Sequence, residues 1–566
     1  MTNQLPNNKK FNKAHKITLQ INKHFLLAWL LGIPFSYIML GFLGNFYQSK
    51  VEFTLISFIC HSLVTGFAFF LIKRIKREFQ SSPMDMAIYM ILAAVLVTFL
   101  ISLVNMALKF PRLFNPSIYR IESGLLIYFF IGSFLTLPTS LLFFTFTQRR
   151  NFQLTSLVSF VENHLGGLLL AFFFFLLYLL IGSIFNQPMF RYIDIFFDTD
   201  VFLWRMRFAT DDYQDLSRRS VHPFINILIR PLIALISVLL KGDTLYATYI
   251  LIALTGSLCV FLVWYFVKQV THNSLYSTLI AAVFGSSTSQ LIFGSLIETY
   301  ILLAATALIF IILLLKDKPQ YTLVIMGLIT FGITFLNFAH NVFAHLLVKR
   351  DIKQLIKYGL IVAVLVVPLN LVNNFIYPDK HPYIWDLSAY GQEEKHTFPP
   401  NFQRAHYLGR VMFLHSVVAP EPLLIKIGTP LLQVWLFRAA IRKAPMLIAE
   451  YEGWFSSGVA YLWFAFMLLG GVLFLKNLLR QDNRFFFTFI LTLVFFFILH
   501  MSYGRDVFLY SANWTYAIFL FLALAWRELS DKRWFQLALL GFIPLLLLNN
   551  SRLILFMFTA SIANMR

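Results

Sequence analysis

Two aspartates, Asp198 and Asp200, stand two residues apart in the segment Phe-Phe-Asp-Thr-Asp-Val, shortly after a long apolar run. A carboxylate held under apolar neighbours at a membrane surface is a better proton acceptor than one in bulk water, so either residue could serve as a general base. The spacing also matches a clamp for a divalent cation such as Mg²⁺ or Mn²⁺. A third reading is that Asp200 caps a helix beginning at Val201.

A histidine-proline pair, His222-Pro223, follows the two aspartates. Proline in the first turn of a helix, preceded by a polar residue, is an ordinary way to begin a helix. Alternatively, His222 binds a phosphate group at the membrane surface together with Arg218 and Arg219, because guanidinium groups match phosphate geometry.

Two further groups of polar residues lie at predicted helix ends. Glu298 and Tyr300 stand between two apolar runs, and an acid there is costly in lipid, so Glu298 should face a cavity or a partner. It could equally be an acid favoured by a helix N-terminus. Arg505 and Asp506 are adjacent near the C-terminal end, where they contact a ligand or form only a local ion pair worth ~0–1 kcal/mol.

Motifs for metal binding or disulfide bonding are not recognisable in the sequence. Cys60 and Cys259 both stand inside apolar runs, where small buried hydrophobic residues are expected. His340 and His345 are five residues apart and do not share a helix face, which argues against a metal pair. A divalent cation therefore rests on Asp198 and Asp200 alone.

Composition places these residues in a membrane protein. The chain has 566 residues, of which 59% are apolar and only 13% charged, with a formal net charge of +20. Such a chain is too apolar to be disordered and has too few charges for a soluble nucleic-acid-binding protein. We therefore expect no nucleic-acid partner.

The elements that position the polar residues are predicted to be membrane-spanning helices. Apolar runs of ~20 residues are long enough to cross a bilayer. The hydropathy pattern predicts about 13–15 spans in an all-α polytopic fold. The predicted spans are 25–45, 53–72, 86–108, 122–147, 164–185, 244–267, 275–294, 299–315, 321–335, a short crossing near 340–348, 358–376, 458–475, 485–501, 513–526 and 534–549.

Basic residues indicate the orientation of these spans. With the N-terminus in the cytoplasm, the predicted inner segments hold 24 basic and 8 acidic residues, which accounts for +16 of the net charge. The outer side is nearly neutral. The first long loop with its acids and His222, together with Glu298, Arg505 and Asp506, then faces outside. Charges in the middle of spans are almost absent, which disfavours an ion-coupled transporter.

The domain organisation follows from the lengths of the loops. Two outer segments are long, and long polar insertions among tight helical hairpins usually carry function and often contain interfacial helices. The expected parts are a basic cytoplasmic N-terminus (1–24), a four-helix membrane bundle (25–150), a catalytic membrane domain (160–550) with outer loops 186–243 and 377–457, and a short C-terminal segment (551–566).

Three stretches, taken in order, resemble a known family. They are FFDTDVFLWRM from residue 196, SVHPFINILIRPL from residue 220 and GSLIETYILL from residue 294, and a later GRDVFLYSANW follows from residue 504. Together they resemble the GT-C superfamily of polytopic membrane glycosyltransferases, especially bacterial relatives of protein O-mannosyltransferase and aminoarabinose transferase. The resemblance covers roughly 160–550. Where relatives often have proline before the glutamate, this chain has Ile297.

The resemblance implies transfer of a sugar from a polyprenyl-phosphate carrier to a glycan, lipid or protein acceptor outside the cytoplasm. It also implies a plasma (inner) membrane location. Asp200 matches the expected general base and Asp198 is the second choice. His222 and Glu298 match further motif residues. The alternatives are a flippase or transporter for a lipid-linked solute, and a polysaccharide polymerase or ligase, which usually relies on outer-loop Arg and His.

Overall fold

The computed structural model describes residues 23–150, 155–190, 195–211, 221–378, 383–426, 432–440, 445–479 and 482–565, with side chains described outside 140–158 and 392. Ten of the described helices are long and apolar enough to cross a membrane, which confirms a multi-pass helical membrane protein. They are α1 (Lys23–Gly44), α2 (Lys50–Ser81), α3 (Pro83–Leu108), α4 (Ser123–Arg150), α5 (Thr155–Phe185), α8 (Thr244–Thr271), α14 (Ile352–Ile376), α16 (Gly453–Asn477), α17 (Arg484–Ser502) and α19 (Arg533–Asn564).

Shorter helices occupy the remaining predicted spans and parts of both predicted outer loops. Those in the predicted spans are α9 (Ser274–Ser286), α10 (Thr288–Phe293), α11 (Tyr300–Leu315), α12 (Gln320–Ile333), α13 (Phe338–Lys349) and α18 (Ala512–Ala525). Those in the predicted outer loops are α6 (Val201–Ala209), α7 (Ile225–Val238) and α15 (Phe402–Arg410). Short helices are therefore present in both predicted outer loops, as the sequence led us to expect.

Contacts divide the chain into two compact units. One comprises residues 1–86 and 116–155, and its described helices α1, α2 and α4 pack on one another. The other comprises residues 87–115 and 156–566. Most of α3 thus belongs with the second unit, in contrast to the predicted four-helix bundle over 25–150. An apolar run shows that a helix can enter the membrane, but it does not show which neighbours the helix packs against.

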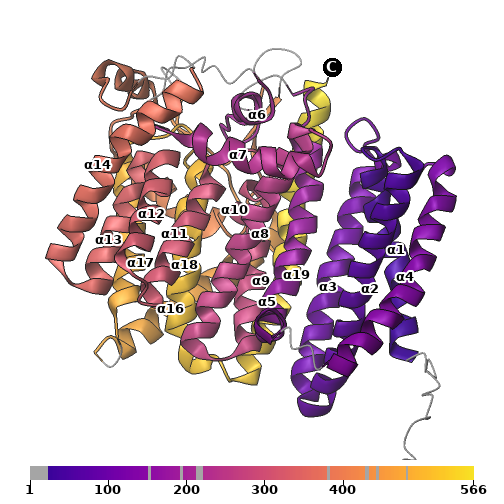
Figure 1. Ribbon diagram of the computed structural model, residues 1–566. Helices are drawn as coiled ribbons and strands as arrows, with labels where there is room; N and C mark the ends of the chain where they lie inside the picture. The colour runs from indigo at the N-terminus through magenta and orange to yellow at the C-terminus, as the bar shows by residue number, and fades with distance from the viewer. Residues whose placement is uncertain are drawn as a thin grey trace, which may run out of the picture. The chain divides into compact units, whose positions relative to one another are not determined.

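The second unit has inner and outer helices. In α8, 72% of the most apolar stretch is buried by protein, whereas in α14 the figure is 22%. The inner helices α8, α11 and α18 are apolar on nearly all sides because other helices surround them. The short helices α6 and α7 lie at one end of the long helices, with α7 crosswise to them (Figure 1).

The span predicted over 275–294 is broken at Ser287, between α9 and α10. The backbone N–H groups of Thr288 and Ser289, which begin α10, donate to the carbonyls of Val417 (3.0 Å) and Ser416 (2.9 Å). A helix start inside protein needs such acceptors. Residues 415–420, which belong to the second predicted outer loop, are therefore buried among the helices of the second unit.

The last helix is longer than the sequence suggested. Asn549 and Asn550 interrupt the final apolar run, yet α19 continues through them to Asn564. Both amides bond to the second predicted outer loop, because Asn549 Nδ2 donates to Ala419 O (2.8 Å) and Asn550 Oδ1 accepts from Ala419 N (2.8 Å). The predicted separate C-terminal segment 551–566 is thus wrong over residues 551–564, which form part of this helix.

The second predicted outer loop also contains short strands, a small departure from the all-α expectation. Two antiparallel pairs form, β1 with β2 and β3 with β4. The strands are β1 (Leu423–Lys426), β2 (Leu432–Trp435), β3 (Phe437–Arg438) and β4 (Leu447–Ile448). Strand β2 also pairs with Phe196 of the first loop, so the two loops are joined through backbone hydrogen bonds.

Candidate functional site

A cavity lies where the ends of several helices of the second unit meet. Tyr300 begins α11, Thr334 ends α12, His500 lies in the last turn of α17, and Asn513 lies in the first turn of α18. Because these helices alternate in direction, their polar ends gather at one end of the unit. The lining residues are Asp198, Asp200, Val221, His222, Tyr300, Thr334, Leu336, Asn337, His396, Phe496, Leu499, His500, Tyr503, Arg505, Leu509, Tyr510 and Asn513.

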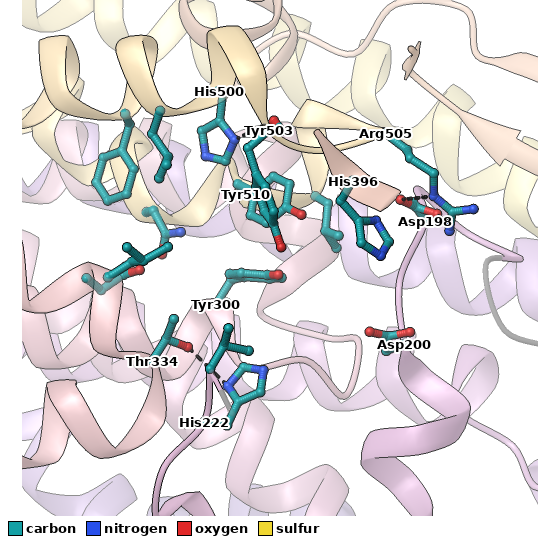
Figure 2. Close-up of a pocket in the computed structure, with 17 residues that line it drawn as sticks. Asp198, Asp200, His222, Tyr300, Thr334, His396, His500, Tyr503, Arg505 and Tyr510 are labelled. Atoms are coloured by element: carbon teal, nitrogen blue, oxygen red, sulfur yellow. Dashed lines mark hydrogen bonds and ion pairs between the residues drawn. The ribbon is translucent and has the colours of Figure 1, made fainter. Parts of the chain in front are cut away.

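Five of the residues singled out from the sequence line this cavity: Asp198, Asp200, His222, Tyr300 and Arg505 (Figure 2). They come from four segments spread over some three hundred positions of sequence. Four other candidates do not line it or are not described. Glu298 and Asp506 point into backbone, as shown below, and Arg218 and Arg219 lie outside the described residues.

Asp198 and Arg505 form an ion pair in the cavity wall. Both Asp198 carboxylate oxygens accept from Arg505, with Nε 3.2 Å from Oδ2 and Nη2 bonded to Oδ1. The Asp198 side chain is 5% exposed and that of Arg505 is 29% exposed. The suggested local pair between Arg505 and Asp506 is therefore wrong, because Arg505 pairs with a residue of the first loop.

Residues 432–439, which include strands β2 and β3, form backbone hydrogen bonds with the segments that carry both partners of this ion pair. Phe197 N donates to Val434 O (2.7 Å), and Ala439 N donates to Arg505 O (2.8 Å). Phe197 and Asp198 adopt left-handed backbone conformations, with φ of 54° and 61°. Each such non-glycine residue stores ~1–3 kcal/mol unless its surroundings hold it in place. The strand and the ion pair supply that restraint at the acidic motif.

Asp506 has a structural role in the same region. Its carboxylate is fully buried and accepts from Leu436 N and Phe508 N, both at 3.0 Å. Burial raises the pKa of Asp506 to about 7, although the backbone N–H donors act in the opposite direction. Asp506 thus fixes the turn that carries Arg505 to the segment 432–439. The sequence had suggested that Asp506 contacts a ligand, but it does not line the cavity.

Glu298 holds the backbone of Asp200. Its Oε1 accepts from Asp200 N at 2.6 Å and its Oε2 accepts from Thr299 N at 3.1 Å, and the side chain is buried. Asp200 precedes α6 at the N-cap position, but its side chain makes no capping hydrogen bond to the helix. The Asp200 carboxylate lines the cavity instead, so Glu298 positions the residue that the sequence marked as the base.

His222 is fixed by the end of α12. Its Nδ1 lies 2.6 Å from Ile333 O and 3.2 Å from Thr334 Oγ1. Because a carbonyl only accepts, Nδ1 carries a proton and donates to Ile333. The ring edge packs on Trp204 of α6 with a centroid distance of 4.8 Å. These contacts orient His222 toward the cavity from the start of α7, so the helix-start and ligand-facing readings are both compatible with its position.

The contributions of the second loop and of the end of α17 were not predicted from the sequence. His396, His500 and Tyr503 line the cavity beside Tyr510, whose ring lies 4.3 Å from that of His500. A histidine inside an apolar run, as at His500, is a signal that could have been used. Nothing in the spacing around His396 indicated its place.

Arg404 of α15 fixes the turn that carries Tyr503 and Arg505. Its guanidinium is fully buried and donates to His500 O (2.9 Å), Tyr503 O (3.0 Å) and Gly504 O (2.8 Å). Burial lowers the pKa of Arg404 to about 10, so the group still carries its charge at neutral pH. A hydrogen bond from Gly504 N to His396 O (2.9 Å) ties the same turn to the second loop.

The carboxylates do not form a divalent-cation clamp as they stand. Both Asp198 oxygens accept from Arg505, so a cation shared with Asp200 would compete with the guanidinium for the remaining lone pairs of Asp198. Across the described ranges no group of three His, Cys, Asp or Glu residues is arranged to hold a metal ion. A divalent cation at Asp198 and Asp200 stays a prediction.

The cavity thus combines a carboxylate at Asp200, a paired cation at Arg505 and several aromatic rings. This set can accept a proton, contact an anionic group and stack against a flat or apolar ligand. No known protein family, characterised protein or solved structure matches this chain.

Proposed function

We propose that the protein transfers a sugar from a polyprenyl-phosphate-linked donor to an acceptor on the extracytoplasmic side of the membrane. The observation that carries this proposal is the meeting of Asp200, His222, Tyr300 and Arg505 in one cavity at the end of a membrane helix unit. A lipid-linked donor needs its reactive phosphate near the membrane surface, and an acceptor needs a base within reach.

In the proposed reaction, Asp200 accepts the proton of the acceptor hydroxyl or amine as the acceptor oxygen or nitrogen attacks the anomeric carbon. The bond from that carbon to the phosphate oxygen breaks, and polyprenyl phosphate leaves with the bonding electron pair. Arg505 stabilises the charge that develops on the phosphate, because hydrogen bonds between ionised groups are the strong ones. One positioned base is sufficient for this direct displacement.

The finer topology is part of the same proposal. We take the protein to have a GT-C-like fold of about 13–15 spans, with its N-terminus in the cytoplasm of a cell with a plasma membrane. The distribution of basic residues supports this orientation. Helix α7 supports a site at the membrane surface, since it buries Ile225, Ile229 and Ile233 while exposing Leu232 and Leu235.

Transfer is tested with the purified full chain in lipid nanodiscs. Polyprenyl-phosphate-linked monosaccharides carrying a radiolabelled sugar are supplied with a membrane extract as acceptor, and labelled product and released polyprenyl phosphate are measured. We expect the wild type to release polyprenyl phosphate and Asp200→Asn to lose release by about 100-fold or more while folding normally. A divalent cation at Asp198 and Asp200 predicts that EDTA abolishes release, and release that persists in EDTA would remove the cation from the proposal.

Asp211→Asn is the matched control. Asp211 lies in the same loop, its side chain is fully exposed, and it is 3.9 Å from Arg230, away from the cavity lining. This variant should keep wild-type transfer. Equal release by wild type and Asp200→Asn would remove Asp200 as the base, and no release from any donor would overturn the proposed transfer.

A glycan ligase or polymerase is the second candidate, favoured by Arg505, His396 and His500 in the cavity. The same assay with a polyprenyl-linked oligosaccharide separates the two candidates, since a ligase transfers the whole glycan. A flippase is distinguished in proteoliposomes, where labelled donor would cross the bilayer without release of polyprenyl phosphate.

A further inference from the structure

A polar stripe follows one face of α13. Asn337, just before the helix, is followed at four-residue intervals by Asn341, His345 and Lys349. Residues four apart on a helix lie one above another on the same face. The stripe therefore runs along the whole length of this helix in the second unit.

The two ends of the stripe are in different surroundings. Asn337 lines the cavity and donates from Nδ2 to Asn513 Oδ1 at 3.0 Å. Lys349, the last residue of α13, pairs with Asp317, whose side chain is 87% exposed. Twelve helical residues span only about 18 Å, less than the ~30 Å of a bilayer's hydrocarbon core. The cavity is thus separated from the opposite end of α13 by a short distance.

The middle of the stripe is buried and under-bonded. His345 and Asn341 are fully buried. Among the described residues, neither ring nitrogen of His345 has a hydrogen-bond partner. The Tyr358 hydroxyl and the Asn341 side chain are close enough to interact with each other. Each buried polar atom left without a partner costs ~1–3 kcal/mol, and proteins usually satisfy such groups with bound water.

Neighbouring helices supply further polar groups. Tyr358 of α14 stacks on the His345 ring at a centroid distance of 5.2 Å and an angle of 10°. Asn341 Nδ2 donates to Thr330 Oγ1 of α12 at 3.1 Å. Gly327 of α12 faces the Tyr358 hydroxyl, and a Cβ there would lie 2.4 Å from that oxygen. A glycine is required at this position for the hydroxyl to enter the interface of the three helices.

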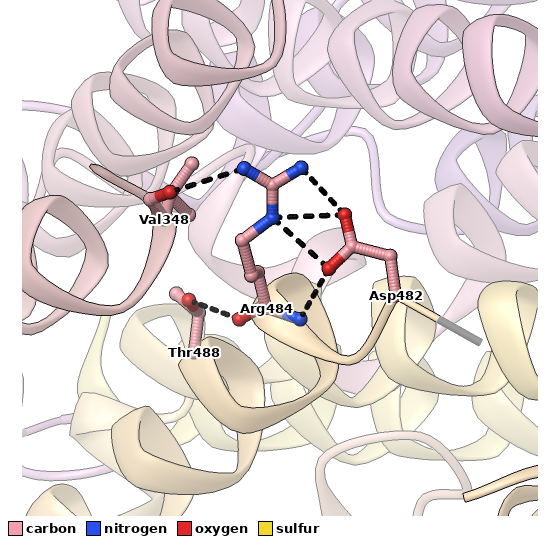
Figure 3. A network of polar contacts seen from close by, with 4 residues as sticks. All are labelled: Val348, Asp482, Arg484 and Thr488. Carbon is pink, nitrogen blue, oxygen red and sulfur yellow. Dashed lines mark hydrogen bonds and ion pairs between the residues drawn. The ribbon is translucent and has the colours of Figure 1, made fainter. Parts of the chain in front are cut away.

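The far end of α13 is held in place by the start of α17. Arg484 Nη1 donates to Val348 O at 3.3 Å, and Asp482 accepts from Arg484 Nε at 2.8 Å and 2.9 Å (Figure 3). The charged groups that act on His345 are Lys349 and Asp351, both near this end. The stripe therefore ends among charged side chains, where protons can exchange with solvent.

We propose that the stripe Asn337–Asn341–His345–Lys349 binds a chain of water molecules and relays protons between the cavity and the opposite end of α13. A proton arriving on a water molecule binds one ring nitrogen of His345, and the other ring nitrogen releases its proton to the next water. Tautomer exchange of the neutral ring then restores the starting state. The carrier is a histidine because its two nitrogens can accept and donate in turn.

Proton flux through proteoliposomes tests this relay. The full chain is reconstituted with a pH-sensitive dye inside, a potassium gradient and valinomycin impose a membrane potential, and the rate of internal pH change is measured without any sugar donor. Wild-type vesicles should change pH faster than protein-free vesicles, and His345→Gln should reduce the rate to the protein-free level. Because no donor is present, the result is independent of the proposed sugar transfer.

Two further variants guard against misfolding. Tyr358→Phe keeps the ring that stacks on His345 and removes only the hydroxyl, so it should fold and slow the flux. His406→Gln changes an exposed histidine of α15 and should leave the flux unchanged. Wild-type vesicles no faster than protein-free ones, or wild-type flux in both His345→Gln and Tyr358→Phe, would overturn the relay.

Discussion

Asp198 and Arg505 lie 307 positions apart in the sequence and share a two-pronged ion pair in the cavity wall. This contact joins the acidic motif of the first loop to the last turn before α18. Strand residues 432–439 bridge the same two segments through backbone hydrogen bonds. Three distant parts of the chain thus form one wall, and the positions of Asp200 and Arg505 relative to each other depend on it.

The ion pair should contribute a measurable coupling energy. Asp198→Asn and Arg505→Gln each remove one partner, and Arg505→Gln is the more damaging because it leaves a buried carboxylate without its cation. In a double-mutant cycle, free energies of unfolding measured by denaturant titration in detergent should reveal coupling of about 0.5–3 kcal/mol. Strictly additive effects would show that the two side chains do not stabilise each other.

Glu298 should act through Asp200. Glu298→Ala removes the acceptor for Asp200 N, so the carboxylate loop shifts, and a misplacement of ~1 Å can lower the rate about 100-fold. Glu298→Gln keeps one oxygen acceptor and should retain more activity. We expect a fall in kcat with little change in KM for the donor. Glu421→Gln, which alters a surface pair with Arg552, is the control, and full activity of Glu298→Ala would refute the positioning role.

Asp506 should make stability depend on pH. Its pKa rises from 3.8 to about 7 in the folded protein, so between these values the folded state holds a proton that the unfolded state has released. Stability should therefore fall as pH increases from about 4 to about 7, by at most about 1.4 kcal/mol per pH unit, and then level off. Unfolding of the wild type and Asp506→Asn is compared across this range. A wild-type slope no steeper than that of the variant would contradict the assignment.

Much of the helical architecture follows from local sequence. Apolar runs such as those forming α8, α14 and α17 predict membrane-spanning helices because burial in lipid depends on length and hydropathy within one segment. The polar residues at helix ends, including Asp198, Asp200, His222, Tyr300 and Arg505, could be singled out for the same reason. A charged or polar group beside an apolar run needs a specific place.

The sequence failed wherever a residue depends on a distant partner. Asn549 and Asn550 look like the end of a span, but hydrogen bonds to residues 417–419 allow α19 to continue. Arg505 looks like the partner of Asp506, but the strand segment directs it to Asp198. His396 carried no signal at all, because its place in the cavity is set by its backbone bond to Gly504.

Hydropathy and charge act over short stretches of chain, so the amino-acid sequence was sufficient to identify a multi-pass helical membrane protein and to mark most of the acids and cations that face one cavity. The pairing of Asp198, the support of Asp200 by Glu298 and the burial of the polar stripe on α13 became visible in the folded structure. Hydrogen bonds and ion pairs form between groups a few ångströms apart in space, and packing alone brings residues hundreds of positions apart to that distance.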